Sequence, residues 1–305
     1  FMYSQNPSSK GYLFLTLRVF SATGGIEQVC KVAGKALYED SLENDFSLSI
    51  FSLYDLRENA SDNPYFPADL FSGFGKAKIS FLKAAINKAP ECSTVLVSHA
   101  NLLPIAWLIR KRSASIKIIL LCHGIEIWNG LSPLRKKMLK AINRFIGVSQ
   151  FTCDRVKQLY GVEAEHCRVV NNPLDPFISL PYKAGKALAR DTFEIEPDKK
   201  VLLTLTRISS EERYKGYDRV IEAMANLKDE IPELLYLIAG KYDEKEYCYI
   251  LEMIRKNALL NRVRLLGYVA DTDIPALFAA SDLYIMPSTQ EGFGIVFIEA
   301  MHYGI

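Results

Sequence analysis

Two cations and two carboxylates in the second half of the chain have the types and spacing needed to hold a charged, hydroxyl-rich ligand. Arg207 and Lys215 lie eight residues apart, and Glu291 and Glu299 enclose a seven-residue segment that begins Gly-Phe-Gly. An arginine supplies a rigid fork of donors and a lysine a compact charge, a combination suited to a diphosphate. The carboxylates accept hydrogen bonds from hydroxyl groups. Glu211, Glu212 and Arg213 between the two cations are also charged, so a solvated loop explains this pair equally well on its own.

The segment around the two carboxylates predicts a strand, a loop and a helix. Residues 283–286 form a short apolar run that is typical of a buried strand, and the apolar-rich residues 295–301 fit a helix packed on it. The loop between them lies at the carboxyl end of the strand, where open α/β sheets bind ligands. A helix that begins near Gly294 directs free backbone N–H groups at an anion.

The first half of the chain offers a glycine turn and two histidines. Gly24-Gly25 lets the backbone approach a phosphate, although a tight turn is the commoner reason for such a pair. His99 and His123 each follow a predicted strand, where a histidine can donate to a substrate oxygen or transfer a proton. A hydrogen-bonded structural imidazole is the alternative. No metal-site spacing accompanies the histidines, so we predict no metal.

Alternating strands and helices are needed to bring these residues to strand ends, and the hydrophobic pattern predicts that alternation in both halves. The strands are predicted at 12–20, 46–53, 94–98, 116–122, 145–148, 168–170, 200–206, 234–239 and 263–266, in addition to 283–286. The helices are predicted at 26–42, 76–88, 102–111, 132–142, 151–160, 217–227, 244–258 and 274–280, in addition to 295–301.

The fold class is therefore α/β, with two Rossmann-like doubly wound domains that face a cleft. We expect a first domain over 1–175, a linker over 176–198 with few apolar residues, and a second domain over 199–305. Residues 57–75 show little periodicity and are expected to form a loop that helps to read a ligand.

The composition of the 305-residue chain is that of an ordinary globular protein, with 49% hydrophobic and 24% charged residues. A net charge of +2 gives no broad electrostatic footprint for nucleic acid. Six scattered cysteines without a C-x-x-C pair predict buried reduced thiols and a cytoplasmic location. Basic clusters at 110–112 and 135–137 indicate solvated helix ends or contact with an anionic membrane surface, and solvated ends are the simpler interpretation.

Glu291 and Glu299 with their surroundings resemble the E-x7-E motif of retaining GT-B glycosyltransferases, specifically the GT4-like group 1 family. Further matches are Gly24-Gly25-Ile26-Glu27, His123-Gly124, Asn171-Asn172-Pro173, Lys215-Gly216 and Leu266-Gly267-Tyr268. The resemblance implies metal-independent transfer of a hexose from a UDP- or GDP-sugar to a saccharide or lipid-linked acceptor in polysaccharide biosynthesis. It implies a cytoplasmic protein, peripheral at the inner membrane face where the acceptor is a lipid, and no cofactor besides the nucleotide-sugar donor.

The resemblance also implies a role for each candidate residue. In the second domain, Arg207 and Lys215 would hold the diphosphate, and Glu299 would accept hydrogen bonds from the ribose. Glu291 would contact the donor sugar, in a loop lined by Phe293, Gly294 and Ile295. From the first domain, Gly25 would approach the phosphate and His123 would lie by the sugar.

Some positions depart from the family pattern. Thr206 and Asn172 stand where the family commonly has glycine, and Phe1 in place of an initiator methionine indicates a trimmed sequence. The sequence stops at Ile305, where the family continues, so we expect a C-terminally truncated second domain. Two alternatives remain open: a sugar-nucleotide epimerase of the same fold, and a non-catalytic sugar-nucleotide-binding protein.

Overall fold

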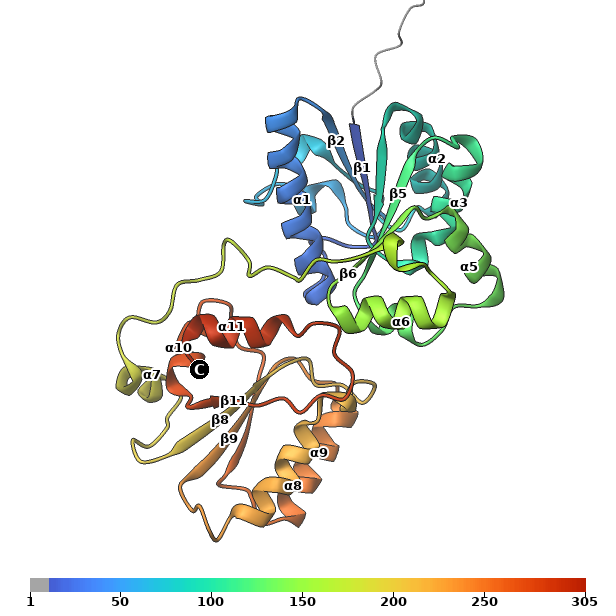
Figure 1. Ribbon diagram of the computed structural model, residues 1–305. Helices are drawn as coiled ribbons and strands as arrows, with labels where there is room; N and C mark the ends of the chain where they lie inside the picture. The colour runs from blue at the N-terminus through green and yellow to red at the C-terminus, as the bar shows by residue number, and fades with distance from the viewer. Residues whose placement is uncertain (1–10) are drawn as a thin grey trace, which may run out of the picture. The chain divides into compact units, whose positions relative to one another are not determined.

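The computed structural model describes residues 11–305 and divides into two compact units, one ending at Phe177 and the other running from Ile178 to Ile305 (Figure 1). Each unit is an α/β structure built on a parallel sheet with helices on both faces. The predicted fold class is therefore confirmed. No helix of the described residues is long and apolar enough to cross a membrane.

The first unit contains a seven-stranded sheet whose pairs are all parallel, in the order β3-β2-β1-β4-β5-β6-β7. Its strands are β1 (Gly11–Thr16), β2 (Ser47–Ser52), β3 (Phe71–Gly73), β4 (Thr94–Val97), β5 (Lys117–Cys122), β6 (Arg144–Gly147) and β7 (Cys167–Val169). Its helices are α1 (Gly25–Asn44), α2 (Lys78–Lys88), α3 (Leu103–Arg112), α4 (Ile125–Trp128), α5 (Pro133–Met138) and α6 (Gln150–Tyr160).

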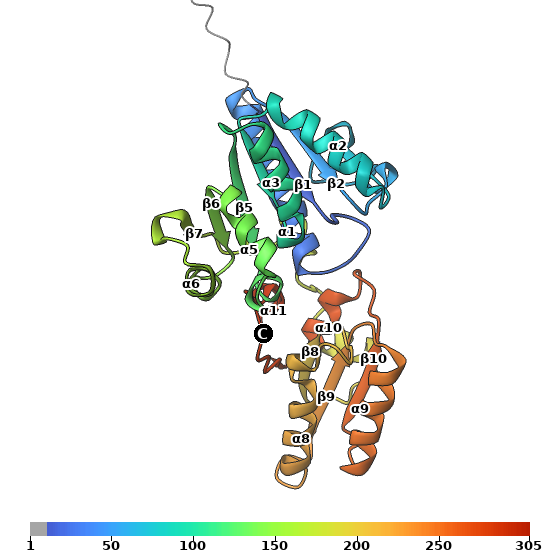
Figure 2. The ribbon, with the colours of Figure 1, turned by 90° about the vertical axis from the view of Figure 1, so that its right-hand side faces the viewer.

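The helices of the first unit cover both faces of its sheet. Helix α1 lies on one face, and α2, α3 and α5 lie together on the other, as both views show (Figures 1 and 2). Leu13 and Leu15 of β1 pack with Phe81 of α2 and Leu103 of α3, all four without solvent exposure. The strands are buried on both faces, which explains why their sequences read as continuous apolar runs.

The second unit contains a four-stranded parallel sheet in the order β10-β9-β8-β11. Its strands are β8 (Lys200–Leu205), β9 (Leu234–Ala239), β10 (Val263–Gly267) and β11 (Leu283–Tyr284). Its helices are α7 (Lys186–Thr192), α8 (Tyr217–Leu227), α9 (Glu244–Lys256), α10 (Ile274–Ala280) and α11 (Ile295–Tyr303). All six residues of β9, the central strand next to β8, are buried.

The first strand ends four residues earlier than predicted because a buried carboxylate accepts hydrogen bonds from the backbone N–H groups that follow it. Asp55 has no solvent exposure and accepts hydrogen bonds from the backbone N–H groups of Val19, Phe20 and Ser21 at 2.6, 3.3 and 2.6 Å. These groups therefore cannot join the sheet ladder, and the chain turns after Thr16. The apolar pattern of the segment gave no sign of this distant acceptor.

Two segments predicted as irregular contain regular structure. Residues 57–75, predicted as a loop, hold 3₁₀ turns at Arg57–Ala60 and Ala68–Leu70 and the edge strand β3. The Asn63 side chain fixes this segment with four hydrogen bonds to the backbone of residues 60, 65 and 66. Helix α7 forms within the predicted linker.

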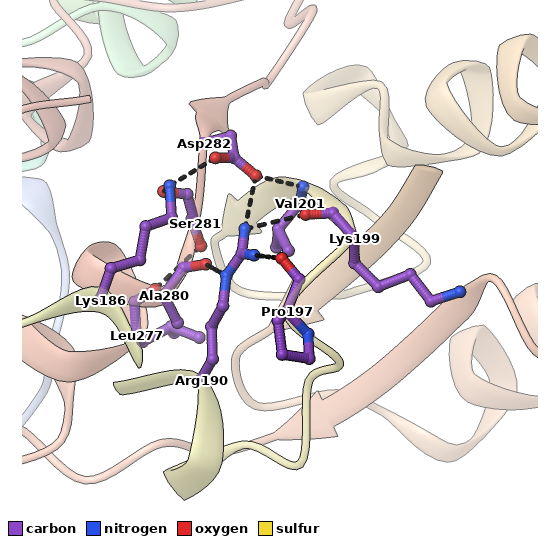
Figure 3. A network of polar contacts seen from close by, with 9 residues as sticks. All are labelled: Lys186, Arg190, Pro197, Lys199, Val201, Leu277, Ala280, Ser281 and Asp282. Carbon is purple, nitrogen blue, oxygen red and sulfur yellow. Dashed lines mark hydrogen bonds and ion pairs between the residues drawn. The ribbon is translucent and has the colours of Figure 1, made fainter. Parts of the chain in front are cut away.

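A buried arginine anchors α7 to the second unit (Figure 3). Arg190 is 8% exposed and donates to the carbonyl oxygens of Ala280, Pro197 and Lys199 and to Oδ2 of Asp282 at 2.9 Å. Asp282 also accepts from the backbone N–H of Val201 at 2.6 Å. This network lies where β8 and β11 begin. Besides the buried Ala189, which joins the core, these polar contacts hold α7 in place, and they leave no apolar periodicity in the sequence.

Candidate functional site

The candidate site of the second unit lies at the carboxyl ends of its strands, where two loops are bonded to each other. One loop follows β8 and contains Lys215, and the other follows β11 and contains Glu291. The backbone N–H of Thr289 donates to the carbonyl oxygen of Tyr214 at 2.8 Å. Gly216 has φ +81°, and a Cβ there would lie 2.6 Å from the carbonyl oxygen of Pro287. Only glycine allows this close approach of the two backbones.

Lys215 and Glu291 form an ion pair across these loops, with Nζ 2.9 Å from Oε2. Their side chains are 17% and 28% exposed, so the pair is partly shielded from water. The structure thus brings together one of the two predicted phosphate-binding cations and the predicted sugar-binding carboxylate. Spacing in the sequence gave no sign of this contact. The second carboxylate oxygen of Glu291, Oε1, has no hydrogen-bond partner among the described residues.

Arg207 lies two residues after the end of β8 and pairs with a carboxylate of its own loop. Its Nε lies 3.1 Å from Oε2 of Glu212, and its Nη2 contacts Oε1. The Arg207 side chain is 67% exposed, whereas that of Glu212 is 16% exposed. Glu212, one of the charged residues between the two cations, is therefore held by a bond within the loop, and Arg207 lies on the solvent side of this pair.

A buried ionic network that we did not predict joins this loop to helix α9. Glu246 of α9 is fully buried and accepts from Nε of Arg213 at 3.0 Å and from the hydroxyl of Tyr217 at 2.9 Å. Asp243 caps α9 through the N–H of Glu246 at 2.8 Å and also accepts from the N–H of Ser210. The sequence Asp-x-x-Glu at the start of α9 is a recognisable capping signal, but it did not show that the glutamate turns toward Arg213.

Helix α11 begins at Ile295, as predicted, with Gly294 as its first flanking residue. Gly294 has φ +82°, and a Cβ there would lie 2.6 Å from the ring of Phe297. No side chain of the described residues caps this end, so the N–H groups of Ile295 and Val296 remain available to an anion, whereas that of Phe297 donates to the carbonyl oxygen of Gly294 at 3.0 Å. Glu299 lies inside α11 and is partly buried; Phe293 and Ile295 are partly exposed at its start.

In the first unit, Gly25 is the first residue of α1 and follows the loop that Asp55 holds. Gly24 has an extended backbone, and a Cβ there would lie 2.6 Å from Oε2 of Glu27. Glu27 is in the first turn of α1, where a carboxylate is favoured by the helix dipole. The start of α1 therefore already has one anionic neighbour.

His123 is buried, with one ring nitrogen bonded and the other without a partner. Nε2 lies 2.8 Å from the carbonyl oxygen of Ser98, which can only accept, so Nε2 carries the proton. Nδ1 is buried and has no hydrogen-bond partner among the described residues. Burial lowers the pKa of His123 to about 4. At neutral pH the side chain is therefore an uncharged acceptor at Nδ1, suited to a hydroxyl donor.

His99 has a structural role in this unit. Its Nδ1 accepts the backbone N–H of Asn101 at 2.9 Å and begins the 3₁₀ turn Ala100–Leu102. Burial is the main cause that lowers the pKa of His99. Each of the two histidines therefore keeps one ring nitrogen without a hydrogen-bond partner among the described residues: Nδ1 of His123, which is buried, and Nε2 of His99.

The cysteine prediction can be compared directly with the structure. All six cysteines are free thiols, and five of them are buried; Cys248 is exposed.

In the described part of the chain, the carboxylates of Glu163 and Glu165 and the imidazole of His166 form an exposed or half-exposed cluster of side chains that could bind a metal ion. Exposed acidic groups commonly gather in this way without an ion, and we assign this cluster no role.

The buried neutral His123 predicts a pH dependence of stability. An unfolded histidine has a pKa of about 6.5, so the unfolded chain binds more protons than the folded one between about pH 6.5 and 4. Stability from this group is complete above that window and is lost as the pH falls through it, by about 3 kcal/mol in total. Urea unfolding of the first unit, followed at several pH values, should show this loss in the wild type and a smaller one in His123→Asn.

The control for this measurement is His166→Asn, because His166 lies in an exposed turn. This variant should keep the pH dependence of the wild type. Equal pH dependence in His123→Asn and the wild type would contradict a buried neutral imidazole.

Comparison with known proteins places this geometry in a family. A family model described as Glycosyltransferase Family 4 matches residues 24–176, which is half of the chain. The chain belongs to glycosyltransferase family 4. A second model, Glycosyl transferases group 1, matches residues 186–305 of this family 4 chain and so covers the second unit. The resemblance recognised from the sequence motifs is thereby confirmed.

Curated relatives match this family 4 chain over part of their length. Mannosylfructose-phosphate synthase of Agrobacterium fabrum is 30% identical over 172 residues, which cover 54% of this chain and 37% of that protein. Glycogen synthase of Mycobacterium tuberculosis is 25% identical over 60% of this chain and 38% of its own length. The matched part of the chain thus spans less than half of each of these two relatives.

Solved structures share the fold of this family 4 chain at low sequence identity. HepE of Anabaena, solved in complex with UDP and glucose, has a TM-score of 0.74 and 22% identity, covering 97% of this chain and 79% of that one. WaaG, a glycosyltransferase involved in lipopolysaccharide biosynthesis, has a TM-score of 0.65 and 15% identity over 96% and 79%. These likenesses establish the two-domain architecture of GT-B glycosyltransferases for this chain.

Proposed function

We propose that the chain is a retaining hexosyltransferase that takes its sugar from a nucleotide diphosphate. The observation that carries the proposal is the Lys215–Glu291 ion pair at the carboxyl edge of the second sheet, beside the uncapped start of α11. A cation, a carboxylate with one unused oxygen and free helix N–H groups lie on loops that are bonded together. This set matches a ligand that carries phosphates and sugar hydroxyls on adjacent groups.

In the proposed reaction, Lys215 and Arg207 bind the diphosphate and stabilise the charge that develops on it as the glycosidic bond breaks. Fixed donors aimed at developing charge are usually the largest catalytic contribution, and here they would require no metal ion. Glu291 orients Lys215 through Oε2 and accepts a sugar hydroxyl at Oε1. Glu299 accepts from the ribose, and the loop of Phe293, Gly294 and Ile295 covers the donor.

The first unit contributes two residues to the proposed reaction. Gly25 offers backbone at the start of α1 to a phosphate, and the unprotonated Nδ1 of His123 accepts a hydrogen bond from a sugar hydroxyl. A neutral His123 neither supplies a proton nor attracts the diphosphate. The donor is a UDP- or GDP-sugar, and the UDP and glucose bound to HepE support this choice. The acceptor is a saccharide or a lipid-linked saccharide, met in the cytoplasm or at the inner membrane face.

A thermal-shift panel of UDP-, GDP- and ADP-sugars tests the proposal first, because a ligand that binds only the folded protein raises its melting temperature. The sugar that binds is then used in a transfer assay, with the anomeric configuration of the product read by NMR. We expect a shift for a UDP- or GDP-sugar, transfer with retained configuration, and loss of the shift in Arg207→Ala/Lys215→Ala. Full binding in that double variant would overturn the phosphate assignment, and release of an isomer without an acceptor would indicate an epimerase.

A further inference from the structure

The charges of this chain are strongly segregated, although its net charge is only +2. Residues 70–153 contain thirteen lysines and arginines but only two acidic residues, Glu91 and Glu126. The rest of the chain carries 24 basic and 33 acidic residues. Both acidic residues of the basic segment have local partners: Glu91 pairs with Lys88 at 2.7 Å, and Glu126 accepts the N–H of His123 at 2.6 Å. The low net charge therefore hides a basic region.

The fold gathers this segment onto one face of the first unit. Helices α2, α3 and α5 pack side by side on the face of the sheet opposite α1, and none of them contains an acidic residue (Figures 1 and 2). We call the outer surface of these three helices the basic face. The exposed cations of these helices are Lys78, Lys83, Lys111, Arg112, Lys136 and Lys137, and Lys76 and Lys140 lie exposed just outside α2 and α5.

Apolar side chains are exposed among these cations. Ile79 of α2 is 71% exposed and follows Lys78 directly, and Leu134 of α5 is 64% exposed and lies next to Arg135. Trp107 of α3 is partly exposed, with Nζ of Lys111 5.0 Å from its ring centroid. Exposed isoleucine and leucine side chains would not strengthen binding to the phosphodiester backbone of a nucleic acid. They can, however, enter the boundary between lipid headgroups and acyl chains. Basic helices with such residues are typical of a surface that rests on a membrane.

We propose that the basic face docks the protein on a membrane surface that contains anionic lipids. The proposal rests on the proposed function for its purpose, because a surface-bound enzyme meets a lipid-linked acceptor there. Its energetics are independent of that function: each lysine near an anionic bilayer strengthens binding by about fivefold, and Ile79 and Leu134 add burial that salt does not screen.

Flotation with lipid vesicles tests the proposal on the purified 305-residue chain. The protein should float with vesicles of phosphatidylcholine plus phosphatidylglycerol and stay behind with phosphatidylcholine alone. In Lys83→Glu/Lys137→Glu, which changes two exposed residues on different helices, the partition coefficient should fall by at least about 25-fold. In Ile79→Ser/Leu134→Ser it should fall mainly at high salt, where the charges are screened.

The matched control is Arg255→Glu/Lys256→Glu, which makes the same charge change in the exposed last turn of α9 in the second unit. This control should float like the wild type. Equal loss in the control, no dependence on phosphatidylglycerol, or tighter binding to single-stranded RNA than to the anionic vesicles would overturn the proposal. Thermal shifts with the nucleotide sugar on the same variants keep the two questions separate, because a failed donor assignment leaves the flotation result unchanged.

Discussion

Lys215→Met should lower kcat/KM for sugar transfer by about 10²- to 10³-fold, the usual loss when one preorganised donor to a developing anion is removed. Lys215 is the less exposed of the two cations, with its Nζ fixed 2.9 Å from Glu291. A cation that is already held in place needs little rearrangement during the reaction. Its full charge can therefore stabilise the diphosphate as it departs. The loss should appear in kcat as well as in KM, because the charge on the leaving group is larger in the transition state.

Initial rates over a range of donor concentrations measure this effect. Lys256→Met provides the control, since Lys256 lies in the exposed last turn of α9 and should leave the rates unchanged. Glu291→Gln keeps the shape of the side chain but releases Lys215 from its ion pair. If the two residues act as a unit, the double variant should lose much less than the product of the single losses. Wild-type rates in Lys215→Met would refute the assignment of Lys215 to the diphosphate.

Arg213→Met should destabilise the second unit by about 3 kcal/mol, because it leaves the carboxylate of Glu246 buried without its cation. Glu246 has no solvent exposure, and Nη2 of Arg213 lies 2.9 Å from its Oε2. The expected loss is at the lower end for a broken buried pair, since the Arg213 side chain is 39% exposed and its place admits water. Urea unfolding followed by a probe in the second unit measures the change.

Replacing both partners, as Arg213→Met/Glu246→Leu, should restore most of the lost stability, because no buried charge remains. The hydroxyl of Tyr217 would still have the carbonyl oxygen of Ser209 at 3.1 Å as a partner. The double variant should nevertheless bind the nucleotide sugar less tightly, because the loop of Lys215 has lost its support. Arg255→Met controls for the loss of an arginine, because Arg255 is exposed on α9, the helix that carries Glu246. Unchanged stability in Arg213→Met would show that the network does not support the loop.

Apolar patterning predicted the class of the fold and the placement of most elements, because each buried strand and helix face must be apolar along its own length. The same reasoning could not place contacts between distant polar residues. Lys215 and Glu291 are 76 positions apart, and their pairing depends on the close approach of Gly216 to Pro287. Asp55 shortened the first strand, and Arg190 fixed α7, through hydrogen bonds that leave no periodic trace.

The sequence motifs predicted the positions of the candidate residues but not the environment of each side chain. Gly294 at the start of α11 was placed correctly because glycine before an apolar helical run is a local signal. The protonation state of His123 was beyond the sequence, since it follows from the carbonyl oxygen of Ser98 and from burial. The roles of the individual residues toward a donor remain predictions until nucleotide sugars are bound.

The network of Arg190 and Asp282 lies where β8 and β11 begin (Figure 3). Lys215 and Glu291 lie beyond the ends of these same strands. Residues that hold the second unit together and residues that face a ligand are therefore separated by the length of a strand. Changes at one edge should rarely disturb the other. A chain built in this way can acquire new substrates by altering the loops of one edge, while a designer who needs a more heat-resistant variant can work on the other.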